Sequence, residues 1–591
     1  MPVSSGSASI RTLIKIGKGR ALTEPGPPDR KQLARESRFV GLVAALLGVV
    51  CFAYCARHSL LLLYGDAVAH LHIARRVFDS LNPGFRQLGS VWLPLPHLLL
   101  IPFVLRMDWW QSGLAGAIPS IACYIFGCVG IYRLSRLWLG VGPSAVAAAF
   151  YGLNPGLLYM QTTAMTEPLF LAEMIWATLL IAEFCTAVQR GFDSSTDDKC
   201  ASRLLIRVGL VLVAAVFTRY DGWIFASFAW LVVAAAMVRG NRWRGVTGGA
   251  FVLFTVMLLA SPLAWMAYNA KQFGDPLDFL RGPYSATAIE ARTTPPGAWH
   301  HPGWHSMRVS ALYFLKAAEL GAVPLRFTNK LLWLSIAGTI AALARWWNRS
   351  IWAAMLLWVP LPFYAYSVAY GSVPIFIPLW WPHSFYNTRY GMEMLPVFAF
   401  FVAAFVGWLL DFVKVLDRRA AGWVLAAVIA MIVLNSVTLA RATPLVLQEA
   451  LANSRTRIPF EQALARTLQP LSTRIQGPIL MYTSEHIGAL QRAGIPLKRT
   501  INEGDYYDWP GALRDPAGSA SLIVAIDGDA VAMAVKEHPD GLDLLTVICS
   551  TDQQCARIYA SRRGPGAGVV QPELGRKSVS RIGVDQLNTR S

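Results

Sequence analysis

The sequence predicts a polytopic membrane protein whose membrane part is all α-helical, followed by a small C-terminal α/β domain. Hydrophobic residues make up 54% of the 591 positions and charged residues only 15%, well below the roughly 25% of charged residues in an ordinary soluble domain. Many apolar stretches are close in length to the roughly 20 residues that a helix needs to cross a bilayer. After residue 441 the apolar runs become short and alternate between strand-like and helix-like patterns.

The basic N-terminal segment, residues 1–38, is expected to be a cytoplasmic tail. It has no continuous apolar run ending at a small-residue cleavage site, as a secretory signal would have. The whole chain carries a formal net charge of +18. In a membrane protein the positive-inside rule accounts for such an excess of arginine and lysine, so nucleic acid is not an expected partner.

The apolar stretches predict about eleven transmembrane helices in a membrane domain over residues 39–441. The expected spans are residues 39–63, 112–132, 142–160, 166–188, 204–218, 222–238, 246–270, 329–344, 351–370, 391–412 and 421–441. They leave three larger outer loops, at residues 64–111, 271–328 and 371–390.

The distribution of basic residues predicts how these helices are oriented. With the N-terminus in the cytoplasm, fourteen basic residues lie in or beside the short inner loops, whereas the short outer loops contain two, Arg219 and Arg389. The fourteen are Arg133, Arg136, Arg190, Lys199, Arg203, Arg207, Arg239, Arg242, Arg244, Arg345, Arg349, Lys414, Arg418 and Arg419. This bias indicates a multi-pass protein of the inner, or plasma, membrane with its C-terminal domain outside the cytoplasm.

The orientation requires the apolar segment 91–110 to lie at the outer surface instead of crossing the membrane. Its uninterrupted apolar run would extend only about 12 Å at ~1.5 Å per residue, too short to span. Prolines precede the run and tryptophans follow it, as in an interfacial or re-entrant helix. Residues 64–80 are likewise expected to form a surface helix, on which Arg75 and Arg76 are candidates for contact with lipid headgroups or a donor phosphate.

Residues 442–563 predict the small α/β domain. Residues 477–484 and 521–527 are strand-like, and residues 485–494 and 529–539 are helix-like. Cys549 and Cys555 flank a turn-like sequence and could form a disulfide in an oxidising compartment. Neither strand is followed by a Gly-rich phosphate loop, so the domain is interpreted as an acceptor-recognition or structural module. Residues 564–591 are expected to be disordered.

Polar clusters gather on the expected outer side of the membrane. Asp66 follows the first span, Glu167 begins the fourth, residues 218–222 form the turn after the fifth, and residues 383–394 lead into the tenth. Taken singly, each acid is explained equally well by an ordinary solvated helix end, and Glu167 fits the first turn of a helix. The clustering on one side is what indicates a functional site.

Arg219 and Arg389 are more informative, because a cation placed against the charge bias indicates an anionic partner. Acids and outward-facing arginines beside a bilayer suit group transfer from a lipid-linked phosphate. One carboxylate would act as general base on an acceptor hydroxyl. The arginines would hold the phosphate and stabilise the charge that grows on it as it leaves.

In the order of these motifs the sequence resembles the GT-C glycosyltransferase superfamily, in particular the polyprenyl-phosphate-sugar enzymes such as protein O-mannosyltransferases and the aminoarabinose transferases of lipid A. The matching segments, within residues 39–440, are "YGDAVAHLHIAR", "WLPLPHLLL", "MTEPLFL" and "NTRYGMEMLP". The resemblance implies a GT-C fold with Asp66 as catalytic base, Glu167 as a second active-site acid and Arg389 as a ligand of the donor phosphate. Ala67 departs from the pattern, since many relatives have a second acid there.

The resemblance also implies the reaction. A hexose or pentose would pass from a polyprenyl-phosphate donor to a hydroxyl of a glycan, lipid or protein acceptor on the extracytoplasmic side, with inversion by a carboxylate general base. No organic cofactor is expected, and a divalent cation is left open.

Weaker candidates surround these residues. Arg219 and Lys271 are further candidates for binding the donor phosphate. The expected substrate-binding residues are His70, Trp92, His97, Tyr220, Asp221, Tyr386, Asn387, Tyr390 and Glu393. His70 lies one turn after Asp66 and is expected to orient it or tune its pKa.

No metal site is predicted, although one cluster of histidines is a possible zinc site. His300, His301 and His305 lie close enough in sequence to bind zinc, but no acid or cysteine lies among them. Stacking of aromatic side chains on a sugar, or plain loop structure, is the preferred interpretation.

Three alternatives remain open from the sequence. One is an oligosaccharyl transferase or O-antigen-ligase-like enzyme that uses a lipid diphosphate donor. A second is a secondary transporter, which would place ionisable groups near the midplane and show two related halves. A third is a non-catalytic surface protein whose C-terminal domain binds a partner.

Overall fold

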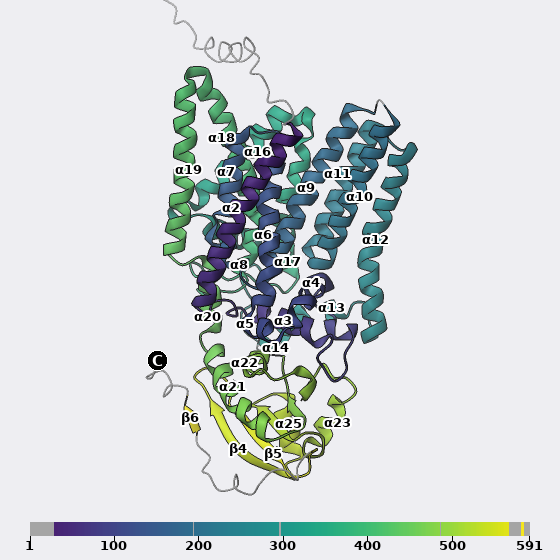
Figure 1. The fold of residues 1–591 in the computed structure, drawn as a ribbon, viewed down its shortest axis with the longest axis vertical. Helices are drawn as coiled ribbons and strands as arrows, with labels where there is room; N and C mark the ends of the chain where they lie inside the picture. Colours follow the sequence, from purple (N-terminus) through teal and green to yellow (C-terminus); the bar gives the residue numbers. More distant parts are fainter. Residues whose placement is uncertain (1–28, 193, 295–296, 485, 566–580, 584–591) are drawn as a thin grey trace, which may run out of the picture.

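The computed structural model describes residues 29–192, 194–294, 297–484, 486–565 and 581–583. Within these residues, ten helices are long and apolar enough to cross a membrane. The long helices run side by side along the longest axis, and the C-terminal sheet lies beyond one end of the bundle (Figure 1). The predicted fold class, a helical membrane bundle with a small α/β part, is therefore confirmed.

The candidate spans follow the predicted apolar stretches closely. They are α2 (Arg30–Arg57), α6 (Leu114–Ser135), α9 (Glu167–Arg190), α10 (Ser195–Thr218), α11 (Asp221–Gly240), α12 (Gly245–Phe273), α16 (Thr328–Trp346), η4 with α17 (Ile351–Trp358, Pro360–Tyr370), η5 with α18 (Thr388–Met394, Leu395–Leu416) and α19 (Arg418–Arg441). Helix α2 begins earlier than predicted, so residues 30–38 of the expected tail are helical, and residues 1–28 lie outside the described residues.

The third predicted span, residues 142–160, is not one continuous helix. It is divided into α7 (Val141–Gly152) and α8 (Pro155–Met160). Asn154 caps α8, accepting a hydrogen bond from the Leu157 backbone N–H at 2.9 Å, and Pro155 cannot donate a helical hydrogen bond to the preceding turn. The chain still passes here from one end of the bundle to the other, because α6 ends and α9 begins at opposite ends.

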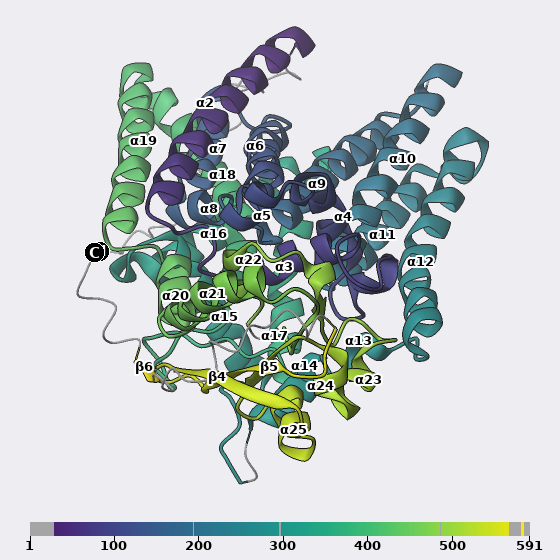
Figure 2. The same ribbon diagram turned by 60° about the horizontal axis from the view of Figure 1, so that its bottom comes forward.

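Short helices cover the end of the bundle that faces the sheet (Figure 2). They are α3 (Gly65–Arg76), η1 (Phe85–Leu88), α4 (Pro94–Val104), α5 (Met107–Ser112), α13 (Asp278–Arg281), α14 (Ala286–Thr293), α15 (Met307–Ala322) and η2 (Leu325–Phe327), while η3 (Trp347–Arg349) follows α16. Segment 91–110 forms the short helices α4 and α5 and no candidate span, as the sequence predicts.

Helix α3 is not the surface helix expected from the sequence, because α4 and the C-terminal helix α22 pack against it and most of its residues are buried. Arg75 serves this packing. It forms an ion pair with Asp79 at 2.7 Å and donates to the Val104 carbonyl oxygen at 2.7 Å. Arg76 donates to the Gln87 carbonyl oxygen at 2.5 Å. Both arginines therefore hold the protein together. Arg75 is buried, which excludes the expected contact with lipid headgroups or a donor phosphate for this residue; for Arg76, which is half-buried, that contact stays a prediction.

The C-terminal part combines helices with one mixed sheet of six strands. The helices are α20 (Leu445–Ser454), α21 (Arg457–Arg474), α22 (Ile487–Ala493), η6 (Leu497–Arg499), α23 (Trp509–Arg514), α24 (Pro516–Ser519) and α25 (Ala530–Glu537). The strands are β1 (Ile479–Met481), β2 (Thr500–Ile501), β3 (Leu522–Ile526), β4 (Leu542–Cys549), β5 (Ala556–Ser561) and β6 (Arg581–Gly583).

The strand order is β2-β1-β3-β5-β4-β6. Strands β1 and β3 are the two predicted strands, and they pair in parallel, whereas β4 and β5 form an antiparallel hairpin that the sequence reading missed. Cys549 and Cys555, which flank the turn of that hairpin, are joined by a disulfide. Strand β6 falls inside the segment expected to be disordered; residues 566–580 and 584–591 of that segment lie outside the described residues.

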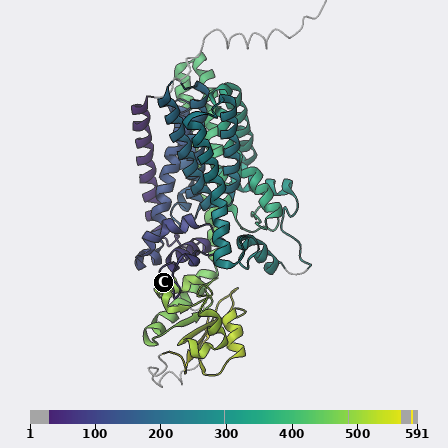
Figure 3. The same cartoon turned by 90° about the vertical axis from the view of Figure 1, so that its right-hand side faces the viewer.

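The C-terminal part lies directly against one end of the bundle (Figure 3), and hydrogen bonds join the two. The Arg457 side chain donates to the Leu63 carbonyl oxygen at 2.8 Å, and the Gln491 amide donates to the Trp110 carbonyl oxygen at 2.5 Å. The backbone N–H of Lys498 donates to Asp79 at 3.2 Å. These contacts fix the C-terminal part against the residues on both sides of α3 and against α5.

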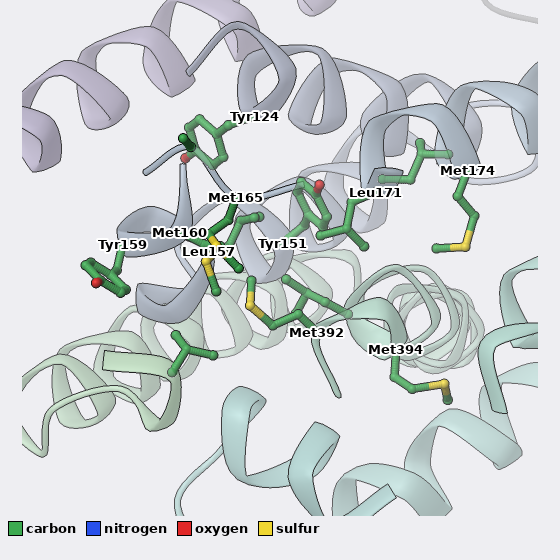
Figure 4. Packing of buried hydrophobic residues seen from close by; sticks show 14 of the residues in the cluster. Tyr124, Tyr151, Leu157, Tyr159, Met160, Met165, Leu171, Met174, Met392 and Met394 are labelled. Atoms are coloured by element: carbon green, nitrogen blue, oxygen red, sulfur yellow. The ribbon is translucent and has the colours of Figure 1, made fainter. Parts of the chain in front are cut away.

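The bundle core is continuous and well packed near that end. Helices α9 and α18 lie at its centre, where most of their residues are buried. Figure 4 shows methionines, tyrosines and leucines from α6, α7, α8, α9, η5 and the segment between α8 and α9 meeting in this core: Tyr124, Tyr151, Leu157, Tyr159, Met160, Met165, Leu171, Met174, Met392 and Met394. Charged residues in the first turn of α9 or just before α18 are therefore buried in the protein.

Candidate active site

Five carboxylates and two arginines form one ion-pair network at the end of the bundle that faces the sheet. The acids are Asp66, Glu167, Asp221, Glu393 and Glu449, and the bases are Arg219 and Arg389. They come from α3, α9, α11, η5 and α20 and from the turn between α10 and α11. Segments distant in sequence meet here because α9 and α18 both present their N-terminal ends to the same place.

Arg389 is held by three acids from three different helices. Its Nη2 lies 2.6 Å from Asp66 Oδ2, its Nε lies 3.2 Å from Glu167 Oε1, and its Nη1 lies 3.3 Å from Glu449 Oε1. A guanidinium offers donors in a fixed planar fork, so three carboxylates around it leave its position little freedom.

Arg219 is the second centre of the network. It forms ion pairs with Asp221 at 3.0 Å, with Glu393 at 3.2 Å and with Glu167 at 3.5 Å. It also donates to the Thr166 hydroxyl at 2.9 Å. Burial alone lowers the pKa of Arg219, but the surrounding acids outweigh burial and raise that pKa well above its usual value. Arg219 is therefore a fixed positive charge, and not the snorkelling arginine of a plain turn.

Exposure separates Asp66 from the other acids. The Asp66 side chain is 41% exposed, whereas those of Glu167, Glu393 and Glu449 are 0% exposed and that of Asp221 is 4% exposed. Asp66 is thus the one carboxylate of the network that a molecule arriving from solvent can reach. Its position in the first turn of α3, directly after Gly65, places it at the mouth of the site.

Two tyrosines belong to the site, and one of them, Tyr390, contacts both arginines. The Tyr390 ring lies 5.1 Å from the Arg219 guanidinium carbon and 5.0 Å from that of Arg389, a cation–π arrangement. The Tyr364 hydroxyl lies 2.7 Å from Glu393 and 3.0 Å from Asp221. Tyr390 was expected at the site from the sequence; Tyr364 was not.

His70 lies near Asp66 but does not hydrogen-bond to it. Its Nδ1 is 2.9 Å from His97 Nε2, and its ring lies 4.5 Å from the Trp92 ring. Burial lowers the pKa of His70 to about 4 and lowers the pKa of His97 well below its ordinary value. His70 instead joins α3 to α4 through His97. The expectation that His70 orients Asp66 or tunes its pKa stays a prediction.

Glu449 is the main site residue that sequence reasoning missed. It accepts from the Thr388 backbone N–H at 2.9 Å as well as pairing with Arg389. It was assigned to the C-terminal domain because it follows residue 441. The available signal was an acid on the same helical face as Leu445 and Val446, since an acid on an apolar face is buried only when it has a partner.

Several predicted residues stay outside the network. Lys271 is exposed in the last turn of α12 and is not part of the acid–arginine network. Tyr220 donates to the Val91 carbonyl oxygen at 2.7 Å, and Asn387 donates to the Pro374 carbonyl oxygen at 2.9 Å. Tyr386 packs on Phe376. These residues shape loops around the site, and the expected phosphate role of Lys271 has no support in the structure.

The histidine cluster does not form a zinc site. The rings of His300 and His305 stack on Trp304 at centroid distances of 4.1 and 4.5 Å, and His301 lies 3.5 Å from Glu290. No group of three or more His, Cys, Asp and Glu side chains in the described ranges is arranged to hold a metal ion.

The helix arrangement is that of a membrane protein with a GT-C-like fold. The structure is similar to the crystal structure of ArnT from Cupriavidus metallidurans bound to undecaprenyl phosphate, with a TM-score of 0.51, 12% identity, and coverage of 91% of this chain and 99% of that chain. The expected fold is confirmed by this likeness, which at such low identity concerns the fold alone.

Weaker similarity is found to archaeal enzymes. The oligosaccharyltransferase of Archaeoglobus fulgidus in its apo form gives a TM-score of 0.46 at 13% identity, covering 89% of this chain and 74% of that chain. Its AglB in complex with an inhibitory peptide and a dolichol-phosphate gives 0.44 at 12% identity, covering 83% and 69%. No protein-family model and no curated protein matches the sequence.

Proposed function

We propose that the protein is a membrane glycosyltransferase that transfers a sugar from a polyprenyl-phosphate donor to an acceptor hydroxyl. The observation that carries this proposal is the pairing of Asp66, the exposed acid of the network, with the buried Arg389 at 2.6 Å. A base that can meet an acceptor and a cation that can meet a phosphate lie within one contact of each other. The ArnT that shares this fold binds undecaprenyl phosphate, which supports a lipid phosphate as the donor.

The proposed step is an inverting displacement at the sugar. Asp66 takes the proton of the acceptor hydroxyl while that oxygen bonds to the anomeric carbon. The bond between this carbon and the donor phosphate oxygen breaks, and its electron pair leaves with the phosphate. The products are the glycosylated acceptor, the polyprenyl phosphate and a protonated Asp66, which later releases its proton. Arg389 and Arg219 stabilise the charge that grows on the leaving phosphate.

In this proposal, binding of the sugar donor frees the catalytic base. Arg389 donates a hydrogen bond from Nη2 to Asp66. When a phosphate oxygen of the sugar donor accepts this hydrogen bond instead, the Asp66 carboxylate becomes available to the acceptor. Glu167 and Glu449 keep the guanidinium in place during the exchange, because both are buried against it. The order of events follows: the donor binds first and the acceptor is activated second.

The network lies at helix ends and not at the middle of the bundle. Glu167 is the first residue of α9 and Asp221 the first of α11. A secondary transporter would place such groups near the midplane, so this arrangement favours the transferase. We further propose that this end is extracytoplasmic, that the N-terminus is cytoplasmic, and that residues 442–563, which contribute Glu449 to the network, take part in acceptor recognition.

The test uses purified protein in detergent with a polyprenyl-monophosphate sugar and measures sugar transfer and donor affinity. We expect Asp66→Asn to lower the transfer rate by about 10²- to 10⁴-fold, the usual contribution of a general base. Donor affinity should stay equal or rise, because asparagine competes less well for Arg389. The matched control is Asp108→Asn, an exposed acid on α5 paired with Arg106, which should keep full activity. Full activity of Asp66→Asn would exclude Asp66 as the base.

A further inference from the structure

The end of the bundle opposite the acid–arginine network contains a cavity of about 950 Å³. Side chains from α2, α6, α9, α10 and η3 line it. Six of the lining residues are arginines: Arg30, Arg133, Arg190, Arg203, Arg207 and Arg349. Glu183 is the single acid among the lining residues. We call this space the basic cavity.

The basic cavity has the opposite charge balance to the proposed active site. There, five acids surround two arginines, and each arginine is paired. Here, six arginines face one acid, and neither Arg203 nor Arg207 has an ion pair to a side chain in the described part of the chain. The Nε of Arg133 is buried without a hydrogen-bond partner in the same part. Convergent guanidinium groups that outnumber the acids, with partly apolar walls, concentrate anions.

The charge bias of membrane loops does not by itself account for this arrangement. That bias is satisfied by arginines spread over the surface, each reaching toward lipid headgroups or water. Arg203 and Arg207, although exposed, lie one helical turn apart on one face of α10, together with Cys200. That face lines the same cavity as Arg133 from α6 and Arg190 from α9. Several helices thus direct their arginines into one shared space that is open to solvent.

The walls of the basic cavity include apolar side chains, among them Leu33, Leu137 and Leu204. On the same helix as Leu33, Phe39 and Leu42 are 68% and 71% exposed, as expected of a flank that faces lipid. A ligand that has a charged headgroup and an apolar part fits a cavity with such walls. Basic pockets between transmembrane helices bind the headgroups of anionic lipids.

We propose that the basic cavity binds a phosphate ester, carried either by an anionic phospholipid headgroup or by a soluble phosphate compound. Guanidinium forks bind phosphate oxygens in a bidentate manner, and the volume lies within the range of about 300–1,000 Å³ usual for ligand sites. This site is separate from the proposed transfer reaction and lies at the other end of the helices, so either proposal can fail without the other.

Lipid binding tests the proposal directly. Native mass spectrometry of the full chain in detergent would compare phosphatidylglycerol with the zwitterionic phosphatidylcholine. We expect phosphatidylglycerol to bind more tightly, and the double variant Arg203→Gln/Arg207→Gln to bind it roughly tenfold or more weakly. The matched control is Arg244→Gln, an exposed arginine at the same end of the bundle that does not line the cavity.

Cys200 gives a second readout that needs no arginine variant. It is an exposed free cysteine that lines the cavity, whereas the other free cysteines of the described residues are buried or half-buried. Its maleimide labelling should be slowed by phosphatidylglycerol, or by inorganic pyrophosphate if the natural source is soluble. Slowing by the lipid alone identifies a lipid headgroup, and slowing by pyrophosphate identifies a soluble phosphate. If neither probe slows labelling and the double variant binds phosphatidylglycerol like the wild type, the proposal is overturned.

Discussion

Glu167 is the residue that joins the two halves of the candidate site. Its Oε1 lies 3.2 Å from Arg389 and 3.5 Å from Arg219, and its side chain is fully buried. A buried acid shared by two cations keeps both arginines in one fixed arrangement, since moving either one leaves an uncompensated charge in a closed environment. Pre-organised positive charge of this kind is what a leaving phosphate requires.

A pH prediction belongs to His70, which stays neutral because it is buried. Burial lowers its pKa from 6.5 to about 4; Asp66 opposes this shift, whereas Arg389 and Arg219 add to it. The unfolded chain therefore binds a proton between these two values that the folded chain does not. The contribution of His70 to stability is complete above pH 6.5 and is lost as the pH falls toward 4.

As the pH falls toward 4, the protonation of His70 in the unfolded chain is expected to lower the free energy of unfolding by on the order of 2–3 kcal/mol. The measurement compares thermal unfolding of the wild type and of His70→Gln in detergent at pH about 7 and about 5. The variant should be less sensitive to acid, because glutamine does not titrate. Equal sensitivity of the two proteins would show that His70 is not held neutral.

At the scale of elements, close packing between helices positions the segment that carries Arg389. Helix α16 packs against α18, which η5 leads into, and Gly338 of α16 lies against the backbone of Phe401 in α18. A Cβ at position 338 would collide with the Phe401 carbonyl oxygen. The glycine thus sets the distance between two helices, one of which continues into the site.

Gly338→Ala is accordingly expected to destabilise the protein by about 1–3 kcal/mol, the usual cost of overpacking. The measurement is the thermal unfolding midpoint of the purified protein. Gly422→Ala is the control, because the added Cβ in α19 meets nothing within 4 Å and alanine favours a helix. It should leave the midpoint unchanged or raise it; a similar loss in both variants would contradict the packing argument.

At the scale of the whole molecule, the two ends of the bundle carry different chemistry. The acid–arginine network and the C-terminal sheet are at one end, and the basic cavity is at the other. The chain reaches the sheet after α19, and the Cys549–Cys555 disulfide lies in that sheet. A disulfide is typical of an oxidising compartment, which agrees with an extracytoplasmic location for this end.

A reporter fusion tests this orientation. Alkaline phosphatase, which is active only outside the cytoplasm, is expected to be active when fused after residue 591. The same enzyme fused after Val415, at the C-terminal end of α18, should be inactive because that end belongs with the basic residues. The reverse pattern would overturn both the proposed orientation and the extracytoplasmic active site.

Much of the site was predictable because its signals are local. Asp66, Glu167 and Arg389 stand at helix ends, where apolar runs meet charge, and the charge bias alone marks Arg389 as unusual. Glu449 and Tyr364 were not predictable in the same way. Their contacts join residues 61 positions apart, from Glu449 to Thr388, and 143 positions apart, from Tyr364 to Asp221, and no local pattern specifies such a partner.

By itself the sequence determined the helical membrane class, the position of nearly every span and the side on which the polar motifs gather, because hydropathy and the charge bias act along short stretches of chain. Only the tertiary structure decided which acids meet which arginines, that α3 is buried under the C-terminal part, and that Asp66 alone among the network acids is exposed. Those features depend on how distant helices pack, and burial changes what each charged group can do.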